Sequence, residues 1–185
     1  MGGRRRRLLA GARGVVLEIG GGTGANLAHY RDVDRVVVAE PDPFMRRRLA
    51  RKLENARVPV EVSAAGAEEL PFPDGSFDTV VSTLVLCTVP DQEAALDEVR
   101  RVLRPGGRLL FIEHVRAGGS AARWQVRLGP LWGHLFGGCH LDRDTVAAIE
   151  EAGFEIETFE SFHPPIAFSG LTPHVQGSAT VRLAA

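Results

Sequence analysis

Short apolar runs alternate along the chain with glycine-rich or amphipathic segments, and this pattern predicts a sheet with helices between its strands. Strands are expected at residues 14–19, 35–40, 58–62, 77–84, 108–114, 154–159 and 175–183. Because helical patterns separate most of these runs, the strands are expected to lie parallel. The last two runs have no helix between them, which predicts one antiparallel strand near the C-terminus. The expected fold class is therefore α/β, with a doubly wound, mostly parallel seven-stranded sheet.

Residues that start and stop helices mark the segments between the strands. Pro43 suits the first turn of a helix whose arginines and lysine form a basic outer face. Asp91 is expected to cap the next helix, and Asp142 is expected to cap a helix that stops at Gly153. The expected helices cover residues 25–30, 43–53, 92–103 and 143–152.

The length of 185 residues suits one well-buried core, so residues 1–185 are expected to form a single domain. Residues 116–141 carry no clear strand pattern and are expected to be an insertion on the substrate side. Apolar residues in this segment have helical spacing, so packing in the core is expected for at least one of its tryptophans. These residues are Trp124, Leu128, Leu131 and Trp132.

Charge gives little indication of a macromolecular partner. The formal net charge is -1, so no global attraction to nucleic acid or to an anionic membrane is expected. A basic run at residues 4–7 is expected to be the solvated face of a short leading helix whose leucines touch the core. Contact of this run with nucleic acid or lipid headgroups is the alternative.

Two cysteines, Cys87 and Cys139, are too few for a disulfide framework and suggest a reducing compartment. No apolar run approaches the roughly 18 residues that span a bilayer, and no signal-peptide core follows the basic start. We therefore expect a cytoplasmic protein without a membrane span. The cysteines and the nearby histidines lack the spacing of metal ligands, so no metal is expected.

The glycine-rich stretch after the first strand is the strongest functional signal. Gly20, Gly22 and Gly24 allow a sharp turn and let a ligand approach main-chain N–H and C=O groups. Glu18 lies inside the apolar strand, and burying its carboxylate costs free energy unless something offsets the cost. Glu40 ends the next apolar run, twenty residues after Gly20, where a nucleotide-binding βαβ unit places an acid on the ribose hydroxyls.

Two ligands compete for this unit. Residues 20–25 fit G-x-G-x-x-G/A, the pattern of NAD-dependent oxidoreductases. Glu18 would repel the pyrophosphate of NAD, whereas S-adenosylmethionine (SAM) carries a sulfonium and an ammonium group that a carboxylate attracts. Glu18 therefore favours SAM. A tight turn between strand and helix, without any ligand, is the third interpretation.

Four blocks of sequence together resemble the class I SAM-dependent methyltransferases of the small-molecule type, which are related to quinone-biosynthesis methyltransferases. The blocks are VLEIGGGTG at 16–24, AEELPFPDGSFD at 67–78, VPD at 89–91 and VLRPGG at 102–107. This resemblance covers nearly the whole chain from Leu8. It implies a Rossmann-like domain with SAM as the cofactor.

Three further blocks resemble a narrower branch, the methyltransferase-like proteins that include alkyl-thiol S-methyltransferases. They are LVLCTV at 84–89, EHV at 113–115 and HLFGGCH at 134–140. The resemblance implies methyl transfer to a small, largely apolar acceptor, with a thiol favoured over a phenol, an amine or a carboxylate oxygen.

The resemblance also implies a set of cofactor-binding residues. The glycines would face the methionine part of SAM, Glu40 would bind both ribose hydroxyls, and Ala67 and Glu68 would border the adenine. Residues 82–84 would form the floor near the sulfonium. The complete set is Glu18, Gly20, Gly22, Gly24, Glu40, Pro41, Ala67, Glu68, Ser82, Thr83 and Leu84.

The sequence departs from the family pattern at two places. Many relatives have an aspartate that binds the adenine amino group where Gly66 stands here, so adenine recognition would depend on backbone groups or on Glu68. Relatives also carry a longer leader before the first strand. A lid over the cleft would then be partial or supplied by a second copy, so a homodimer is an open alternative.

Methyl transfer requires an in-line approach of the nucleophile, which positioning largely supplies. A thiol with a pKa of about 8.5 needs only a modest base. His114 is the candidate catalytic base, because it ends a strand at the edge where ligands of such sheets bind. A packing or hydrogen-bonded histidine is the equally weighted alternative.

The leading hypothesis is a SAM-dependent methyltransferase that acts on a small molecule and binds no nucleic acid. A non-catalytic protein that binds SAM or S-adenosylhomocysteine and regulates a partner is the second hypothesis. An NAD-dependent oxidoreductase is the third.

Overall fold

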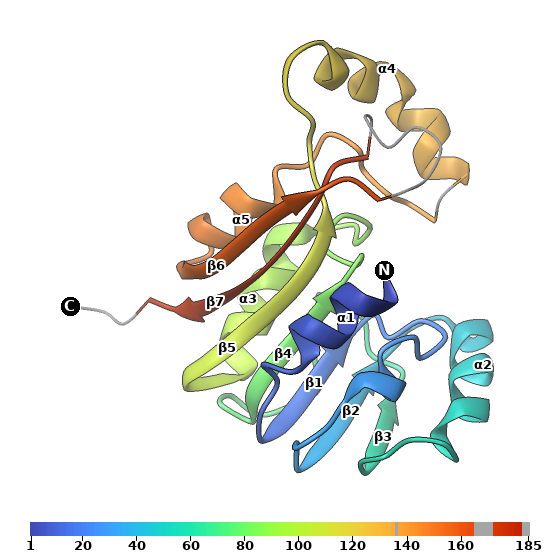
Figure 1. Ribbon diagram of the computed structural model, residues 1–185, viewed down its shortest axis with the longest axis vertical. Coiled ribbons are helices and arrows are strands. Elements are labelled where there is room, and N and C mark those ends of the chain that lie inside the picture. The colour runs from blue at the N-terminus through green and yellow to red at the C-terminus, as the bar shows by residue number, and fades with distance from the viewer. Residues whose placement is uncertain (136, 165–171, 183–185) are drawn as a thin grey trace.

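The computed structural model describes residues 1–135, 137–164 and 172–182, and these form a seven-stranded sheet with helices on both faces (Figure 1). The strand order is β3-β2-β1-β4-β5-β7-β6. The strands are β1 (Val15–Ile19), β2 (Arg35–Ala39), β3 (Val60–Ser63), β4 (Phe77–Thr83), β5 (Leu103–His114), β6 (Phe154–Phe162) and β7 (His174–Val181).

The strand directions confirm the predicted fold class. The pairs among β1 to β5 are parallel, and β7 lies antiparallel between β5 and β6. At the centre, Val16 of β1 pairs with Val36 on one side and with Thr79 on the other. The antiparallel strand near the C-terminus is thus the one that the helix-free connection predicts.

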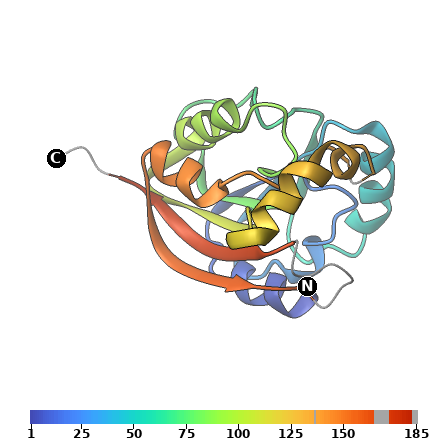
Figure 2. The same ribbon diagram turned by 90° about the horizontal axis from the view of Figure 1, so that it is seen from above.

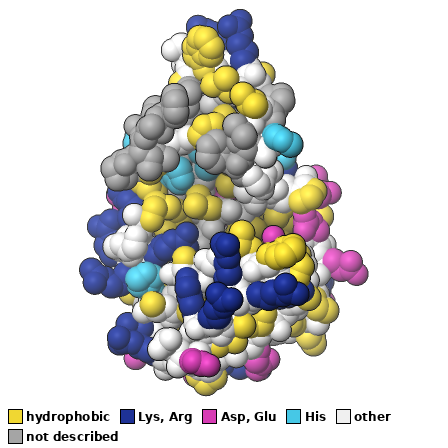
Figure 3. Space-filling model, turned by 90° about the vertical axis from the view of Figure 1, so that its right-hand side faces the viewer, with side chains coloured by type: hydrophobic (Ala, Val, Ile, Leu, Met, Phe, Trp, Pro, Cys, Tyr) yellow, Lys and Arg dark blue, Asp and Glu magenta, His cyan; other side chains and the backbone are white. Residues whose placement is uncertain are grey.

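The helices lie largely where the sequence predicts them. Asp91 caps α3 and accepts a hydrogen bond from the backbone N–H of Ala94. Pro43 occupies the first turn of α2, whose basic outer face carries clustered Lys and Arg side chains (Figure 3). The helices are α1 (Gly2–Leu9), α2 (Pro43–Leu53), α3 (Gln92–Val102), α4 (Gly119–Leu135) and α5 (Thr145–Glu151).

Two predicted helix boundaries are wrong. The segment after the glycine loop forms only a short 3-10 helix, η1 (Leu27–His29), because tertiary hydrogen bonds of Asn26 and Tyr30 set its backbone. The cap of α5 is Asp144 rather than Asp142. Arg143 donates to the carbonyls of Leu86 and Val89, which ties the preceding residues to another loop and delays the helix start.

Helices cover both faces of the sheet (Figure 2). The two faces carry separate apolar clusters, as expected for a doubly wound fold. Phe111 and Leu96 belong to the cluster beneath α3 and α5. Val16 and Leu9 belong to the cluster on the opposite face. The burial of Leu9 confirms the short leading helix and the contact of its leucine with the core.

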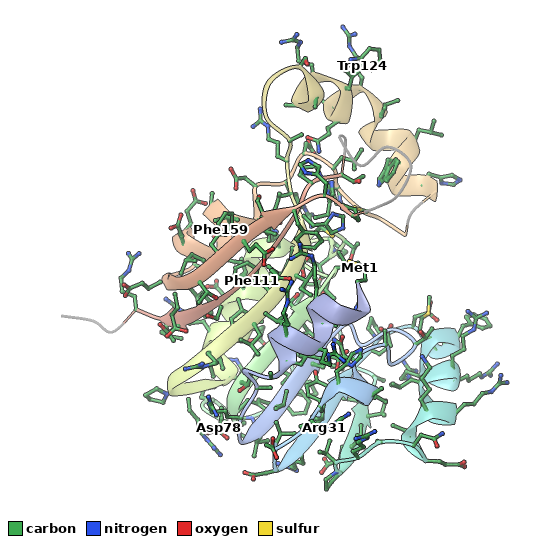
Figure 4. The ribbon with its side chains drawn as sticks, in the orientation of Figure 1. Met1, Arg31, Asp78, Phe111, Trp124 and Phe159 are labelled. Carbon is green, nitrogen blue, oxygen red and sulfur yellow. The ribbon has the colours of Figure 1, made fainter. Side chains whose placement is uncertain are left out.

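The segment at 116–141 contains α4, which extends beyond the carboxyl ends of the strands (Figure 1). Trp124 is 54% exposed and points outward from this helix (Figure 4), so it does not pack in the core. Trp132 is only half-buried. Phe136, within the block at 134–140, lies outside the described residues. Among the described helices, none has the length and apolar character needed to cross a membrane.

Candidate active site at the carboxyl edge of the sheet

The parallel register brings the predicted cofactor residues to one edge of the sheet. Ile19, the last residue of β1, pairs with Ala39 on one side and with Ser82 on the other. The residues that follow these three positions are Gly20, Glu40 and Thr83. They therefore lie next to one another, where ligands of open parallel sheets bind.

The glycine loop combines packed and open positions. Gly20, Gly22 and Gly24 have φ angles of +55°, +55° and +74°, which side chains rarely adopt. A Cβ atom added to Gly20 would lie 2.5 Å from Val85, whereas one added to Gly22 would meet nothing closer than 4.0 Å. Gly22 thus borders open space, which a ligand can approach.

Glu40 is held rigidly across this space. Its Oε2 accepts from the backbone N–H of Gly22 at 2.7 Å, and its Oε1 accepts from that of Asp42 at 2.9 Å. Each carboxylate oxygen has a second acceptor position, so Glu40 can also receive two hydroxyl groups. Pro41 is exposed beside it, and its carbonyl accepts from Arg46 at 2.6 Å.

Glu18 lies behind the loop rather than in the open space. It is 2% exposed, and its two oxygens accept from Asn26 at 3.0 Å and from the Tyr30 hydroxyl at 2.7 Å. Burial raises the pKa of Glu18 to about 7, and the hydrogen bonds from Tyr30 and Asn26 oppose that rise. Glu18 therefore acts on the loop through Asn26.

Arg5 joins this site, although the charge pattern of the sequence predicts it on a solvated helix face. Its Nη1 donates to Asn26 Oδ1 at 2.6 Å and to Thr83 Oγ1 at 3.0 Å. Burial lowers the pKa of Arg5, against the charge of Glu18. The missed signal is its helical spacing, because Arg5 lies four residues before the buried Leu9 and shares its face.

Arg4 also departs from the predicted solvated face. Its guanidinium lies 3.7 Å from the ring centroid of Phe162 and 2.7 Å from Glu160. Two of the four leading arginines are therefore bound to other elements of the fold.

The end of β4 is shaped by Glu113, a residue of the EHV block for which the sequence predicts no role. Glu113 is fully buried and accepts from Ser82 Oγ at 2.7 Å and from the backbone N–H groups of Val85 and Cys87. Burial raises its pKa, and these hydrogen bonds oppose the rise. Leu84, which lies between Ser82 and Val85 in the chain, has a φ of +63°, a strained conformation that is common at functional sites.

The loop after β3 contributes an unsatisfied acceptor. Ala67 is buried, and Glu68 has a buried Oε1 with no hydrogen-bond partner among the described residues. Such an atom is costly unless a ligand or water satisfies it. Its position after β3 suits the adenine-binding role that the resemblance implies.

His114 lies at the end of β5 and is 3% exposed. Its Nδ1 lies 3.9 Å from Cys139 Sγ, and its ring meets that of His174 edge-on, with 5.6 Å between centroids. Its Nε2 is buried without a hydrogen-bond partner in the described part of the chain. His134 and His140, by contrast, are exposed.

Within residues 1–135, 137–164 and 172–182, no group of three or more His, Cys, Asp or Glu side chains has an arrangement that could hold a metal ion. The polar groups at this edge are instead carboxylates, an amide, a guanidinium and an imidazole around an open backbone turn. This set suits a ligand that carries hydroxyl groups and charges of both signs.

Comparison with known proteins adds evidence of two kinds. A family model described as a methyltransferase domain matches residues 17–111. The human thiol S-methyltransferase TMT1B is 42% identical over 178 residues, which cover 92% of this chain and 73% of that protein. The match to this protein thus extends well beyond the glycine loop.

Solved structures show the same fold at low identity. Geranyl diphosphate methyltransferase in complex with SAM has a TM-score of 0.79 at 16% identity, over 97% of this chain and 84% of that one. The [4+2]-cyclase SpnF has a TM-score of 0.77 at 18% identity, over 99% and 81% of the two chains. The fold thus accommodates different chemistries, so the fold alone does not define the function.

Proposed function

This chain belongs to the SAM-dependent methyltransferase family, and we propose that it transfers the methyl group of SAM to the sulfur of a small, apolar thiol. The observation that carries the proposal is the 42% identity to a human thiol S-methyltransferase across 92% of the chain. SAM is thus the cofactor. The two alternative interpretations of the glycine loop, an NAD site and a turn without any ligand, do not apply. As a methyltransferase, the protein is an enzyme rather than a regulator.

The residues at the carboxyl edge fit SAM by their chemistry. Gly22 leaves open space beside the loop, where the methionine part would lie. Glu40 offers two fixed acceptors for the ribose hydroxyls, and the unsatisfied Glu68 Oε1 is an acceptor for the adenine amino group. This acceptor would replace the aspartate that relatives carry at the position of Gly66.

Arg5 is suited to the carboxylate of the methionine part. The two hydrogen bonds of its guanidinium to described residues go to neutral oxygens, those of Asn26 and Thr83. A guanidinium has five N–H donors, so several stay available for a carboxylate. Hydrogen bonds between charged groups are about twice as strong as neutral ones, and partial burial strengthens them further.

Replacing Arg5 with methionine should therefore weaken SAM binding about tenfold or more, since one charge-assisted hydrogen bond contributes about 1.5–3 kcal/mol. Calorimetry would measure the affinity, with Arg6→Met as the control because Arg6 is exposed on the same helix. Methylthioadenosine, which lacks the carboxylate, should bind the parent and Arg5→Met alike. An equal loss of affinity for SAM and for methylthioadenosine would contradict the assignment of Arg5 to the carboxylate.

The chain's contribution to the reaction is positioning and removal of one proton. When bound, SAM supplies an electrophilic methyl group on a sulfonium, which leaves as a neutral thioether. His114 would accept the thiol proton at Nε2 while the thiol sulfur attacks the methyl carbon in line. The strained turn at Leu84 and its anchor Glu113 would hold the floor beneath this approach.

The α4 segment would form the acceptor wall. Leu128 and Trp132 are half-buried on this helix, whereas Trp124 faces solvent. An apolar wall favours a small organic acceptor over nucleic acid. A homodimer that covers the cleft, a cytoplasmic location and residues 1–185 as one domain are further parts of this proposal.

A panel of acceptors would test the proposal directly. Purified protein with SAM should methylate small apolar thiols, and mass spectrometry should detect the methyl thioether and S-adenosylhomocysteine in equal amounts. Phenols, amines and carboxylates of matched size should react much more slowly at neutral pH. Turnover of those acceptors without any thiol turnover would contradict the thiol assignment and leave the methyltransferase family unaffected.

A further inference from the structure

Two cysteines and a histidine from three separate segments meet beside the proposed acceptor site. Cys87 follows β4, His114 ends β5, and Cys139 follows α4. We call the contact between Cys139 and His114 the Cys139–His114 pair. Its sulfur and Nδ1 atoms are 3.9 Å apart, within the distance of a hydrogen bond to sulfur.

The backbone fixes Cys139 at this position. The N–H of His140 donates to the carbonyl of Cys87 at 2.8 Å, and the N–H of Gly138 donates to the carbonyl of Gly133 at 2.8 Å. Gly138 has a φ of +86°, which lets the chain turn sharply just before Cys139. The pair is therefore held by hydrogen bonds on both sides of the cysteine.

Hydrogen bonding favours a thiolate at Cys139. The pKa of Cys139 is lowered, chiefly by a hydrogen bond from the Cys87 thiol and then by His114 and Trp132, although burial opposes the shift. The pKa of Cys87 is raised by the same hydrogen bond, by burial and by the charge of Glu113. Cys87 therefore stays a protonated donor.

The remaining titratable neighbour does not compete for the proton. His174 lies opposite His114 across the β5–β7 pair, and its Nδ1 contacts the carbonyl of Thr172 at 2.7 Å. Burial lowers the pKa of His174, and interactions with His114 and His163 act in the same direction, whereas the hydrogen bond to Thr172 and the charge of Cys139 oppose the shift. The lowered pKa favours the neutral form of His174.

We propose that Cys139 is a positioning residue for the acceptor base: its sulfur accepts the Nδ1–H of His114 and leaves the buried, unpartnered Nε2 free to take a proton. The inference rests on the proposed function. It assigns Cys139 the part that a carboxylate plays beside histidine in hydrolytic triads, which is to select the tautomer and stabilise the imidazolium.

Each bond that breaks in this step is matched by a bond that forms. The acceptor S–H bond breaks and an Nε2–H bond forms on His114, while the new S–CH₃ bond replaces the S–CH₃ bond of the sulfonium. The imidazolium then returns its proton to solvent as the products leave. Cys139 keeps its charge throughout and forms no covalent bond.

Replacing Cys139 with alanine should lower kcat at least tenfold at pH 7 while the Kd of SAM stays at the parent value. Because the imidazolium loses its anionic neighbour, the acidic limb of the kcat–pH profile should move to lower pH. Cys139→Asp restores an anion beside His114 and should return the acidic limb of the kcat–pH profile to its position in the parent. His134→Ala, an exposed histidine of α4, is the matched control.

Alkylation supplies a readout that needs no turnover. Iodoacetamide labelling followed by mass spectrometry should give a Cys139 labelling midpoint that rises in His114→Ala, with buried Cys87 as the unlabelled reference. The positioning role alone is overturned if the labelling midpoint of Cys139 is unchanged in His114→Ala, or if Cys139→Ala lowers kcat equally at every pH. If the midpoint does rise but the parent protein methylates no thiol, the proposed function and the base role are overturned together.

Discussion

Replacing His114 with alanine is expected to lower kcat for a small apolar thiol about 100-fold at neutral pH, while SAM binding stays near the parent value. The reason is that His114 ends β5 at the proposed ligand-binding edge, and its Nε2 atom is buried without a hydrogen-bond partner among the described residues. Steady-state kinetics would measure kcat, and calorimetry would measure the SAM affinity.

The pH dependence separates a base from a packing residue. Below the thiol's own pKa of about 8.5 the parent enzyme needs a base, whereas above it the thiolate forms unaided. The deficit of His114→Ala should therefore shrink as the pH rises through that value. A variant that keeps full activity at neutral pH would show that His114 is structural, and His134→Ala serves as the surface control.

Replacing Glu40 with alanine should weaken SAM binding at least tenfold without unfolding the protein. Two charge-assisted hydrogen bonds to the ribose would be lost, each contributing about 1.5–3 kcal/mol. The backbone N–H groups of Gly22 and Asp42 would also lose their acceptor, which loosens the glycine loop.

Calorimetry and thermal unfolding together test this prediction. Glu54→Ala removes the same charge from an exposed position at the end of α2 and should bind SAM like the parent. An unchanged affinity in Glu40→Ala would contradict the ribose assignment. A loss of affinity accompanied by loss of the folded state would show that Glu40 acts mainly through the loop.

The parts of the fold that depend on local sequence were predicted well. The apolar runs mark the strands because burial on both faces of a parallel sheet demands continuous valine and isoleucine. Asp91 and Pro43 mark helix starts because their effects act within one turn. Glu40 and the glycines lie at the predicted edge because parallel strands end together.

The helix boundaries that failed depend on contacts with distant segments. The segment after the glycine loop is bound to Glu18 through Asn26 and Tyr30, and this overrides its helical propensity. The start of α5 is delayed because Arg143 binds carbonyls of the loop after β4. Neither partner can be identified from the neighbouring residues.

The sequence by itself determined the doubly wound sheet, the glycine loop and the acids at its edge, since periodicity, capping and backbone freedom are local properties. Only the tertiary structure decided that Arg5 reaches Thr83, that Glu113 anchors the turn after β4 and that Cys139 contacts His114. These contacts join residues 25 to 78 positions apart in the chain. Their side chains meet because the sheet order and the path of α4 bring them together, and no short-range pattern records such proximity.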